Sequence, residues 1–226
     1  MFKERRECWN ERLRNSCKEV FSLKPIREYF FLTGSAALSV FWLGHRRIDN
    51  LDFFTVKDVD FTELGLYFKN IFSKNLVVSN EQYILIRAPE KISFAKDHLS
   101  IKIKRPAIMI DDVSIRVDTL RNLLGNKMSA FVSRFSRNDV FDVLCSLRRF
   151  KHKERIAAKM LLWAQKTEIL AEDTSYIYSL LESVPEIYPD ISTMFPNEIE
   201  ILKETVKALD LKVEELYDNL PRKPIF

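Results

Sequence analysis

The segment from residue 31 to residue 54 constrains the fold of this chain more than any other. It begins with an apolar run, passes through a glycine and a serine into small apolar residues, and ends in alternating apolar and polar residues. Gly34 permits a tight turn, and residues 36 to 42 fit a short helix behind it. The alternation over residues 51 to 56 is typical of a half-buried strand. The segment therefore predicts a strand, a glycine turn, a short helix and a second strand.

The rest of the chain divides into a β-rich part and a helical part. Helical spacing of apolar residues covers residues 6 to 22 and 61 to 72, whereas residues 76 to 117 are rich in β-branched residues. Short strands are predicted at 77–78, 83–86, 92–94, 99–103 and 113–117, extending the first sheet. The pattern predicts an α+β domain with a mixed sheet and flanking helices over residues 1–118, followed by a helical domain over residues 119–226.

Within the predicted helical domain, proline positions suggest where helices begin and end. Pro185, Pro189 and Pro196 predict a loop-rich stretch, and Pro196 is expected to open a last helix over residues 197 to 219. Residues 153 to 219 carry no recognisable motif. They are expected either to pack on the core or to bind a partner protein or a second copy.

Composition narrows the class of protein. The 226 residues carry a net charge of +4, which is compatible with nucleotide or nucleic-acid partners. The three cysteines form no CxxC pair, which fits reduced thiols. The charged N-terminus has no apolar stretch behind it, and no apolar run is long enough to span a membrane. We therefore expect a cytoplasmic protein that makes no contact with a membrane.

The chemistry expected of the opening segment concerns phosphate and metal. A glycine turn that leads into a helix lets backbone N–H groups meet phosphate oxygens, and Gly34 with Ser35 fits this requirement. Strand periodicity places Asn50 and Asp52 on one face of the second strand and Asp49 on the other. Side-chain oxygens on one sheet face are the ligands that Mg²⁺ prefers.

Two groups of residues together resemble a known family. Leu32-Thr-Gly-Ser-Ala-Ala-Leu38, then Leu43-Gly-His-Arg46, then Leu51-Asp-Phe-Phe-Thr55, resemble the opening motif of the AbiEii/AbiGii toxin family, LTGGTAL followed by LGHR-x-S-x-DLDFF. Lys127 to Ala130, Arg134, Asp139 and Asp142 resemble its helical motif. The resemblance covers residues 28 to 150. It implies a nucleotidyltransferase fold of the polymerase-β type and toxin roles in abortive infection or toxin–antitoxin pairs.

The resemblance also implies roles for individual residues. Gly34 and Ser35 would contact the triphosphate of an NTP substrate, Asp52 with Asn50 would hold Mg²⁺ or Mn²⁺, and Lys127 would contact the nucleotide phosphates. Asp139 and the catalytic Asp142 would complete the site from the helical side, with Arg134 as a phosphate contact or ion-pair partner. The reaction implied is transfer of NMP to an RNA (for example tRNA) or protein hydroxyl, and an antitoxin protein is a possible partner.

Several observations keep alternatives open. Asn50 stands where the family has its first metal aspartate, and no third carboxylate is evident. Asp97, Asp111 and Asp112 are expected in turns, and the strand candidate from Ser100 to Lys104 offers lysines where a carboxylate would be needed. The chain is therefore either a nucleotidyltransferase or a weakened or inactive binding module on the same fold.

Alternatives also stay open for the helical motif and for the loop before the second strand. By spacing, Lys127 with Arg134 and Asp139 with Asp142 each share a helix face, so an inter-helix salt bridge is the alternative to a site role. His45 and Arg46 are expected to fix the loop by hydrogen bonds.

Overall fold

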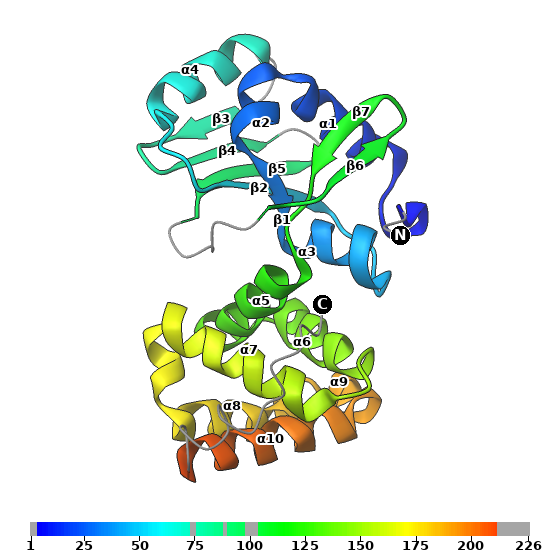
Figure 1. Ribbon diagram of the computed structural model, residues 1–226, viewed down its shortest axis with the longest axis vertical. Coiled ribbons are helices and arrows are strands. Elements are labelled where there is room, and N and C mark those ends of the chain that lie inside the picture. Colours follow the sequence, from blue (N-terminus) through cyan, green and yellow to red (C-terminus); the bar gives the residue numbers. More distant parts are fainter. Residues whose placement is uncertain (1–3, 73–75, 88–89, 98–103, 212–226) are drawn as a thin grey trace. The chain divides into compact units, whose positions relative to one another are not determined.

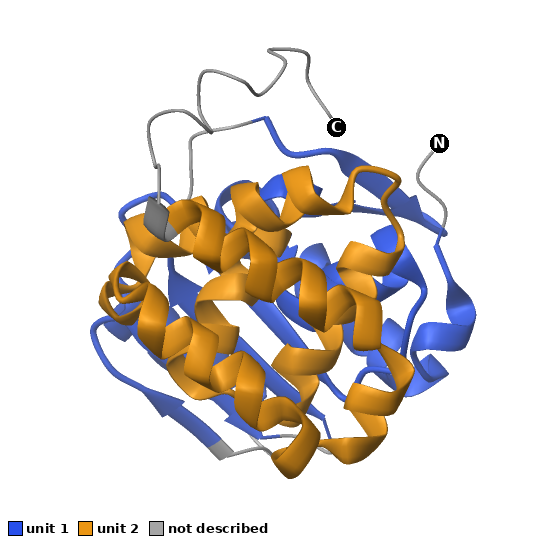
Figure 2. Ribbon diagram, turned by 90° about the horizontal axis from the view of Figure 1, so that it is seen from below, with its two compact units in different colours: residues 1–123 blue, residues 124–226 orange. Residues whose placement is uncertain are grey.

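The computed structural model describes residues 4–72, 76–87, 90–97 and 104–211. The chain divides into two compact units, Met1–Leu123 and Leu124–Phe226, coloured separately in Figure 2. The first unit contains all the described strands, and the second is helical (Figure 1).

A five-stranded sheet forms the centre of unit 1. Its strands are β1 (Phe31–Thr33), β2 (Asn50–Thr55), β3 (Leu76–Ser79), β4 (Tyr83–Arg87) and β5 (Lys91–Lys96), in the spatial order β1-β2-β5-β4-β3. β2 and β5 run parallel, and the other neighbours are antiparallel. This mixed sheet confirms the predicted α+β class and the strands predicted around residues 77, 84 and 93.

Helices cover one face of this sheet (Figure 1). They are α1 (Glu11–Ser22), α2 (Lys24–Tyr29) and α4 (Phe61–Ile71). The Asn10 and Asp60 side chains accept backbone N–H bonds at the starts of α1 and α4, which explains why those helices begin where they do. Against the sheet, the rings of Phe53 and Phe94 stack at 5.2 Å, and Phe21 packs on Phe53 at 5.4 Å. The aromatic core therefore lies on this face.

The strand predicted at 113–117 does not simply extend the first sheet. It forms β7 (Val113–Arg116), which pairs with β6 (Ala107–Ile110), a strand that the sequence pattern did not indicate. Asp111 turns this hairpin with a φ of 53°. One parallel bridge, between Leu32 and Val117, joins the hairpin region to β1. The strand expected at 99–103 lies outside the described residues, which end at residue 97 and resume at residue 104.

Unit 2 consists of helices, as predicted. They are α5 (Leu120–Arg134), which spans the boundary between the units, α6 (Arg137–Arg148), α7 (Lys153–Thr167), η3 (Ile169–Glu172), α8 (Thr174–Ile187), α9 (Pro189–Met194) and α10 (Pro196–Leu211). The prediction of a loop-rich stretch was wrong. Pro185 lies inside α8, and Pro189 is the first residue of α9, a position where the missing N–H of proline breaks no helical hydrogen bond. Pro196 opens the last helix, as expected, and residues 212 to 219 lie outside the described part.

Candidate functional site

The glycine turn lies between β1 and a short helix. α3 (Gly34–Ala37) follows β1 directly and continues as the π-helical η2 (Leu38–Leu43), so the predicted order of elements is confirmed. Gly34 has a φ of 63°, which side chains disfavour. A Cβ atom at Gly34 would also lie 2.8 Å from Oδ2 of Asp52. Glycine is therefore required twice here, for the backbone conformation and for the close approach of the turn to the Asp52 carboxylate.

Asp52 lies between two hydrogen-bond donors. The Asn50 side-chain nitrogen donates to Asp52 Oδ2 at 2.9 Å, and the Ser93 hydroxyl donates to Asp52 Oδ1 at 2.5 Å. Asn50 and Asp52 share one face of β2, as the alternation predicted, because buried and half-buried residues alternate along this strand. Ser93 comes from β5, where the parallel register places it opposite Asp52. Both oxygens of the carboxylate are thus used as acceptors.

Strand register also identifies cations on the same sheet face. Asn50 lies opposite Lys91 on β5, and Lys91 lies opposite Arg87 on β4. Lys91 and Arg87 are both exposed. Two residues along the strands, the next row on this face contains Asp52 and Ser93, so the row with the two cations adjoins the row with the carboxylate. This face is therefore polar and charged, whereas the opposite face carries the aromatic core.

Tyr83 gives an independent indication that these groups share one environment. Tyr83 and Arg87 are four residues apart on β4, so their side chains lie on the same face of the strand. Burial raises the pKa of the Tyr83 phenol, the negative charge of Asp52 raises it further, and Arg87 lowers it. The phenol is thus close enough to sense both charges.

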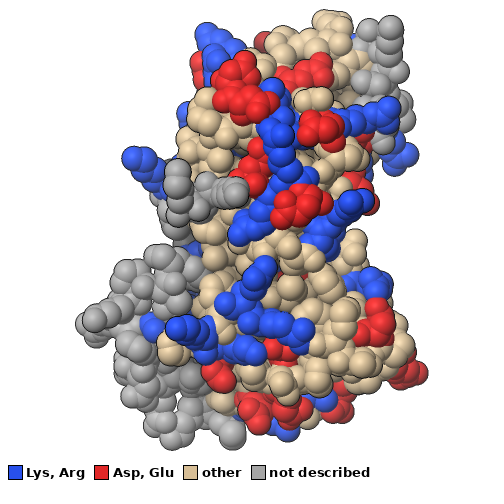
Figure 3. Space-filling model, turned by 90° about the vertical axis from the view of Figure 1, so that its right-hand side faces the viewer, with Lys and Arg blue, Asp and Glu red and all other residues tan. Residues whose placement is uncertain are grey.

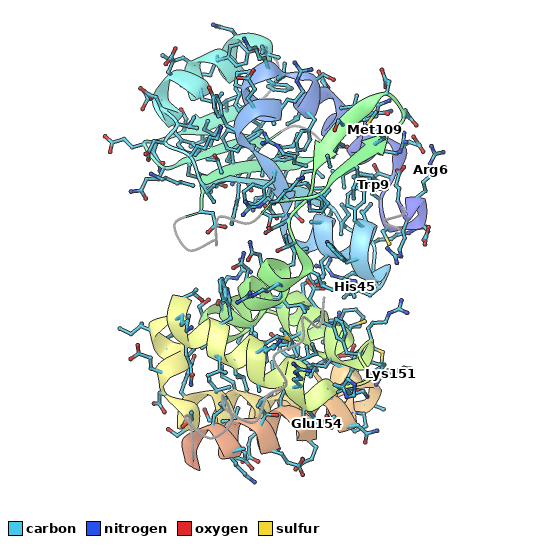
Figure 4. All side chains as sticks on the ribbon, in the orientation of Figure 1. Arg6, Trp9, His45, Met109, Lys151 and Glu154 are labelled. Atoms are coloured by element: carbon cyan, nitrogen blue, oxygen red, sulfur yellow. The ribbon has the colours of Figure 1, made fainter. Side chains whose placement is uncertain are left out.

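The residues after the turn fix it to the loop that precedes β2. Arg46 donates from Nη2 to the Ser35 hydroxyl at 2.6 Å. His45, labelled in Figure 4, has its Nδ1 3.3 Å from the hydroxyl of Ser39. These bonds agree with the expectation that His45 and Arg46 hold the loop. They also place an arginine at the start of α3.

The donor set around Asp52 does not fit the magnesium site that the family resemblance implies. Mg²⁺ is bound by carboxylates and other oxygens, and a catalytic pair of ions needs several shared negative charges. Among the described residues, the side chains bonded to the Asp52 carboxylate are one amide, which donates through its nitrogen, and one hydroxyl. The described residues contain no cluster of three or more His, Cys, Asp or Glu side chains suited to a metal ion. A role for Asn50 as a ligand would require its amide oxygen to turn toward the ion.

The four predicted residues of the helical motif meet within unit 2. The Lys127 ammonium on α5 lies 2.7 Å from Asp142 Oδ2 and 3.3 Å from Asp139 Oδ1. Arg134, largely exposed, lies 3.0 Å from Asp139, which also accepts a bond from the Ser136 hydroxyl at 2.6 Å. The inter-helix salt bridge considered as an alternative is present. Its centre is not solvated, because Asp142 is fully buried and Lys127 is 7% exposed.

Sequence reasoning missed the residues that β4 and β5 contribute. Ser93 was placed in a strand but given no role, and Arg87 and Lys91 were not singled out. One local signal pointed to Ser93: it is a single hydroxyl between Ile92 and Phe94 in a strand that is otherwise apolar there. The signal could not show that Asp52 is its neighbour.

Comparison with solved structures supports the fold alone. The chain is similar to JHP933 from Helicobacter pylori, with a TM-score of 0.51 and 15% identity over 93% of this chain and 94% of that one. It also matches an H. pylori protein described as a candidate nucleotidyltransferase (TM-score 0.47, 15% identity, 91% and 95% covered) and an antigenic nucleotidyltransferase-like protein from Paracoccidioides brasiliensis (0.46, 12%, 89% and 95%). No protein-family model matches the sequence. No curated protein matches it either.

Proposed function

We propose that this chain is a nucleotidyltransferase-like protein that binds a nucleoside triphosphate on the sheet face of unit 1 that carries Asp52, and that it transfers nucleotides slowly or not at all. The observation that carries the proposal is the close approach of the Gly34 backbone to Asp52, in a turn that leads directly into a helix. The motif resemblance points to the same turn.

The charges around the turn suit a triphosphate. Backbone N–H groups at a helix start attract phosphate oxygens, and the helix dipole adds to this attraction. Arg46 reaches the same turn through Ser35, and Lys91 with Arg87 adds two exposed cations on the face of Asp52. A ligand with three or four negative charges would have cations on more than one side.

The same geometry argues against efficient transfer. In nucleotidyl transfer the acceptor oxygen forms a bond to the α-phosphorus while the bond to pyrophosphate breaks, and catalysis depends on neutralising the developing charge. Asp52 is the carboxylate that the described parts of β2 and β5 contribute to this face, and its oxygens accept bonds from Asn50 and Ser93. We therefore derive no step through a metal ion.

Nucleotidyl transfer to an RNA or protein hydroxyl is the second candidate. The observation in its favour is the position of Asp52 in the middle of the face, beside the glycine turn. The roles of Lys127, Arg134, Asp139 and Asp142 toward a nucleotide stay predictions of the motif resemblance. So do the toxin role, the antitoxin partner and the cytoplasmic location. The described helices include none that is long and apolar enough to cross a membrane.

Titration with a fluorescent nucleoside triphosphate, followed by anisotropy, tests the binding proposal. The Arg87→Gln/Lys91→Gln double variant should bind at least about tenfold more weakly, which corresponds to about 1.4 kcal/mol shared between two exposed charge contacts. The matched control is Lys24→Gln/Lys69→Gln, which removes the same charge from exposed positions on α2 and α4. The proposal fails if the natural chain does not bind, or if both double variants bind equally.

A second experiment separates binding from transfer. The natural chain is incubated with each labelled NTP and with tRNA or lysate, in Mg²⁺ and in Mn²⁺. Binding without label transfer is the expected result. Transfer that disappears in Asp52→Ala would establish the second candidate instead.

A further inference from the structure

The turn between α6 and α7 carries the densest positive charge in the described part of unit 2. Five Lys and Arg residues and one histidine fall within eight positions, against a single glutamate, Glu154; the cations are Arg148, Arg149, Lys151, Lys153 and Arg155. Lys and Arg outnumber Asp and Glu by only 36 to 32 in the whole chain. The local excess is therefore a property of this turn, and not of a uniformly basic surface.

A buried glutamate holds the two ends of the turn. Glu198 on α10 is 2% exposed, and it accepts bonds from Arg148 at 3.0 Å and from Lys153 at 2.6 Å. Both cations keep the pKa of Glu198 low against the opposing effect of burial. Arg148 also lies over the ring of Phe195 at 4.1 Å. The last residue of α6 and the first of α7 are thus fixed in place by one carboxylate.

The bonds to Glu198 hold the two ends of the turn and leave its middle facing solvent. Arg149, Lys151 and His152 are all exposed. Lys151 projects outward in Figure 4, and Figure 3, which views that side, shows Lys and Arg side chains gathered there. The side chain of His152 does not cap α7, and cations near a helix N-terminus oppose the helix dipole. An anion bound at this turn would therefore meet exposed cations and the N-terminus of α7.

We infer that the α6–α7 turn binds the sugar-phosphate backbone of a nucleic acid, with Arg149 and Lys151 as phosphate contacts. Phosphate contacts need cations and no apolar centre, whereas protein interfaces have an apolar core depleted in charge. Arg149, Lys151 and His152 offer no exposed apolar side chain, and Phe150 between them is half-buried. The inference does not depend on nucleotide binding by unit 1.

Anisotropy titrations with labelled single-stranded RNA and with DNA of the same sequence test this inference across salt concentrations from about 50 mM to about 200 mM. Arg149→Gln/Lys151→Gln should reduce the magnitude of the negative slope of log K against log salt by about 1.4, because each single-strand phosphate contact contributes about 0.7 to that slope. At about 0.1 M salt this corresponds to roughly 25-fold weaker binding. Comparing the RNA and DNA arms shows which backbone is preferred.

The matched control is Lys166→Gln/Lys207→Gln, which removes two exposed cations elsewhere in unit 2, at the far end of α7 and on α10. It should retain the affinity and salt slope of the natural chain. Failure of the natural chain to bind either nucleic acid at about 50 mM salt, or equal losses in the two double variants, would overturn the inference. So would equally tight binding of polyglutamate, which would point to an acidic protein partner.

Discussion

Adding two carboxylates beside Asp52 tests whether this sheet face has the geometry of a metal site but lacks its charge. The perturbation is the double variant Asn50→Asp/Ser93→Asp. Both positions already hold a donor within 2.9 Å of an Asp52 oxygen, so three carboxylates would converge in the variant. Without metal, the variant loses two hydrogen bonds to a charged group, about 1.5–3 kcal/mol each, and gains like-charge repulsion. We expect the unfolding free energy to fall by about 4 kcal/mol or more.

Manganese should reverse part of that loss in the double variant only. At a free Mn²⁺ concentration about 100 times the dissociation constant, binding returns about 2.7 kcal/mol, which raises the melting temperature by about 5–10 °C for a chain of this length. Thermal unfolding with and without Mn²⁺ measures this shift. The paramagnetic resonance signal of free Mn²⁺ measures binding directly, so the test does not depend on enzymatic activity.

The control variant is Ser22→Asp/Asn80→Asp, which adds the same charge at exposed positions of unit 1 away from Asp52. It should show no Mn²⁺-dependent shift. The reasoning is refuted if the double variant at Asn50 and Ser93 binds no Mn²⁺. It is equally refuted if the natural chain binds Mn²⁺ as tightly as the variant does.

Three further predictions concern stability. Gly125→Ala should lower the unfolding free energy by about 1–3 kcal/mol, because the added Cβ would lie 1.9 Å from Cδ1 of Trp163; urea unfolding measures the loss, and Trp163→Leu in the same chain should restore part of it. Hydrogen bonds from the α1 cations hold the pKa of Asp111 below its usual range, so its contribution is present above about pH 4 and is lost as pH falls through the depressed pKa. The natural chain should therefore exceed Asp111→Asn in stability at pH 7, and urea titrations in increasing acid should show this difference shrinking; a constant difference would contradict the assignment. Lys127→Met removes the buried ammonium from two buried carboxylates and should cost about 3–5 kcal/mol, whereas Arg134→Gln should cost less than about 1 kcal/mol because that guanidinium is mostly exposed. Equal losses of unfolding free energy in the two variants, measured by chemical denaturation, would show that the buried Lys127 contributes no more to stability than the exposed Arg134.

Local patterns predicted the elements of unit 1 well, because burial on one face imposes alternation on each strand. The alternation over residues 50 to 55 placed Asn50 and Asp52 together, and the structure agrees. Ser93 could not be assigned in this way. Its neighbour on β2 is set by a parallel pairing across 41 positions, and a local pattern carries no information about that register.

Helical spacing had the same limit in unit 2. It predicted that Lys127 and Arg134 share one face of α5, which is a property of the helix period. It could not show that one of them would be buried against two carboxylates while the other stayed exposed. Proline rules misled at Pro185, which lies inside α8 near its C-terminal end although it lacks the N–H that would bond to the carbonyl four residues earlier.

The parallel pairing of β2 with β5 has a consequence for folding kinetics. β3, β4 and β5 follow one another as antiparallel neighbours and can pair early, whereas β5 meets β2 only after a long loop has closed. The Ser93–Asp52 hydrogen bond crosses this late contact. We therefore expect Ser93→Ala to speed unfolding in stopped-flow measurements while leaving the folding rate nearly unchanged. The candidate site would then be the last part of the sheet to form and the first to be lost.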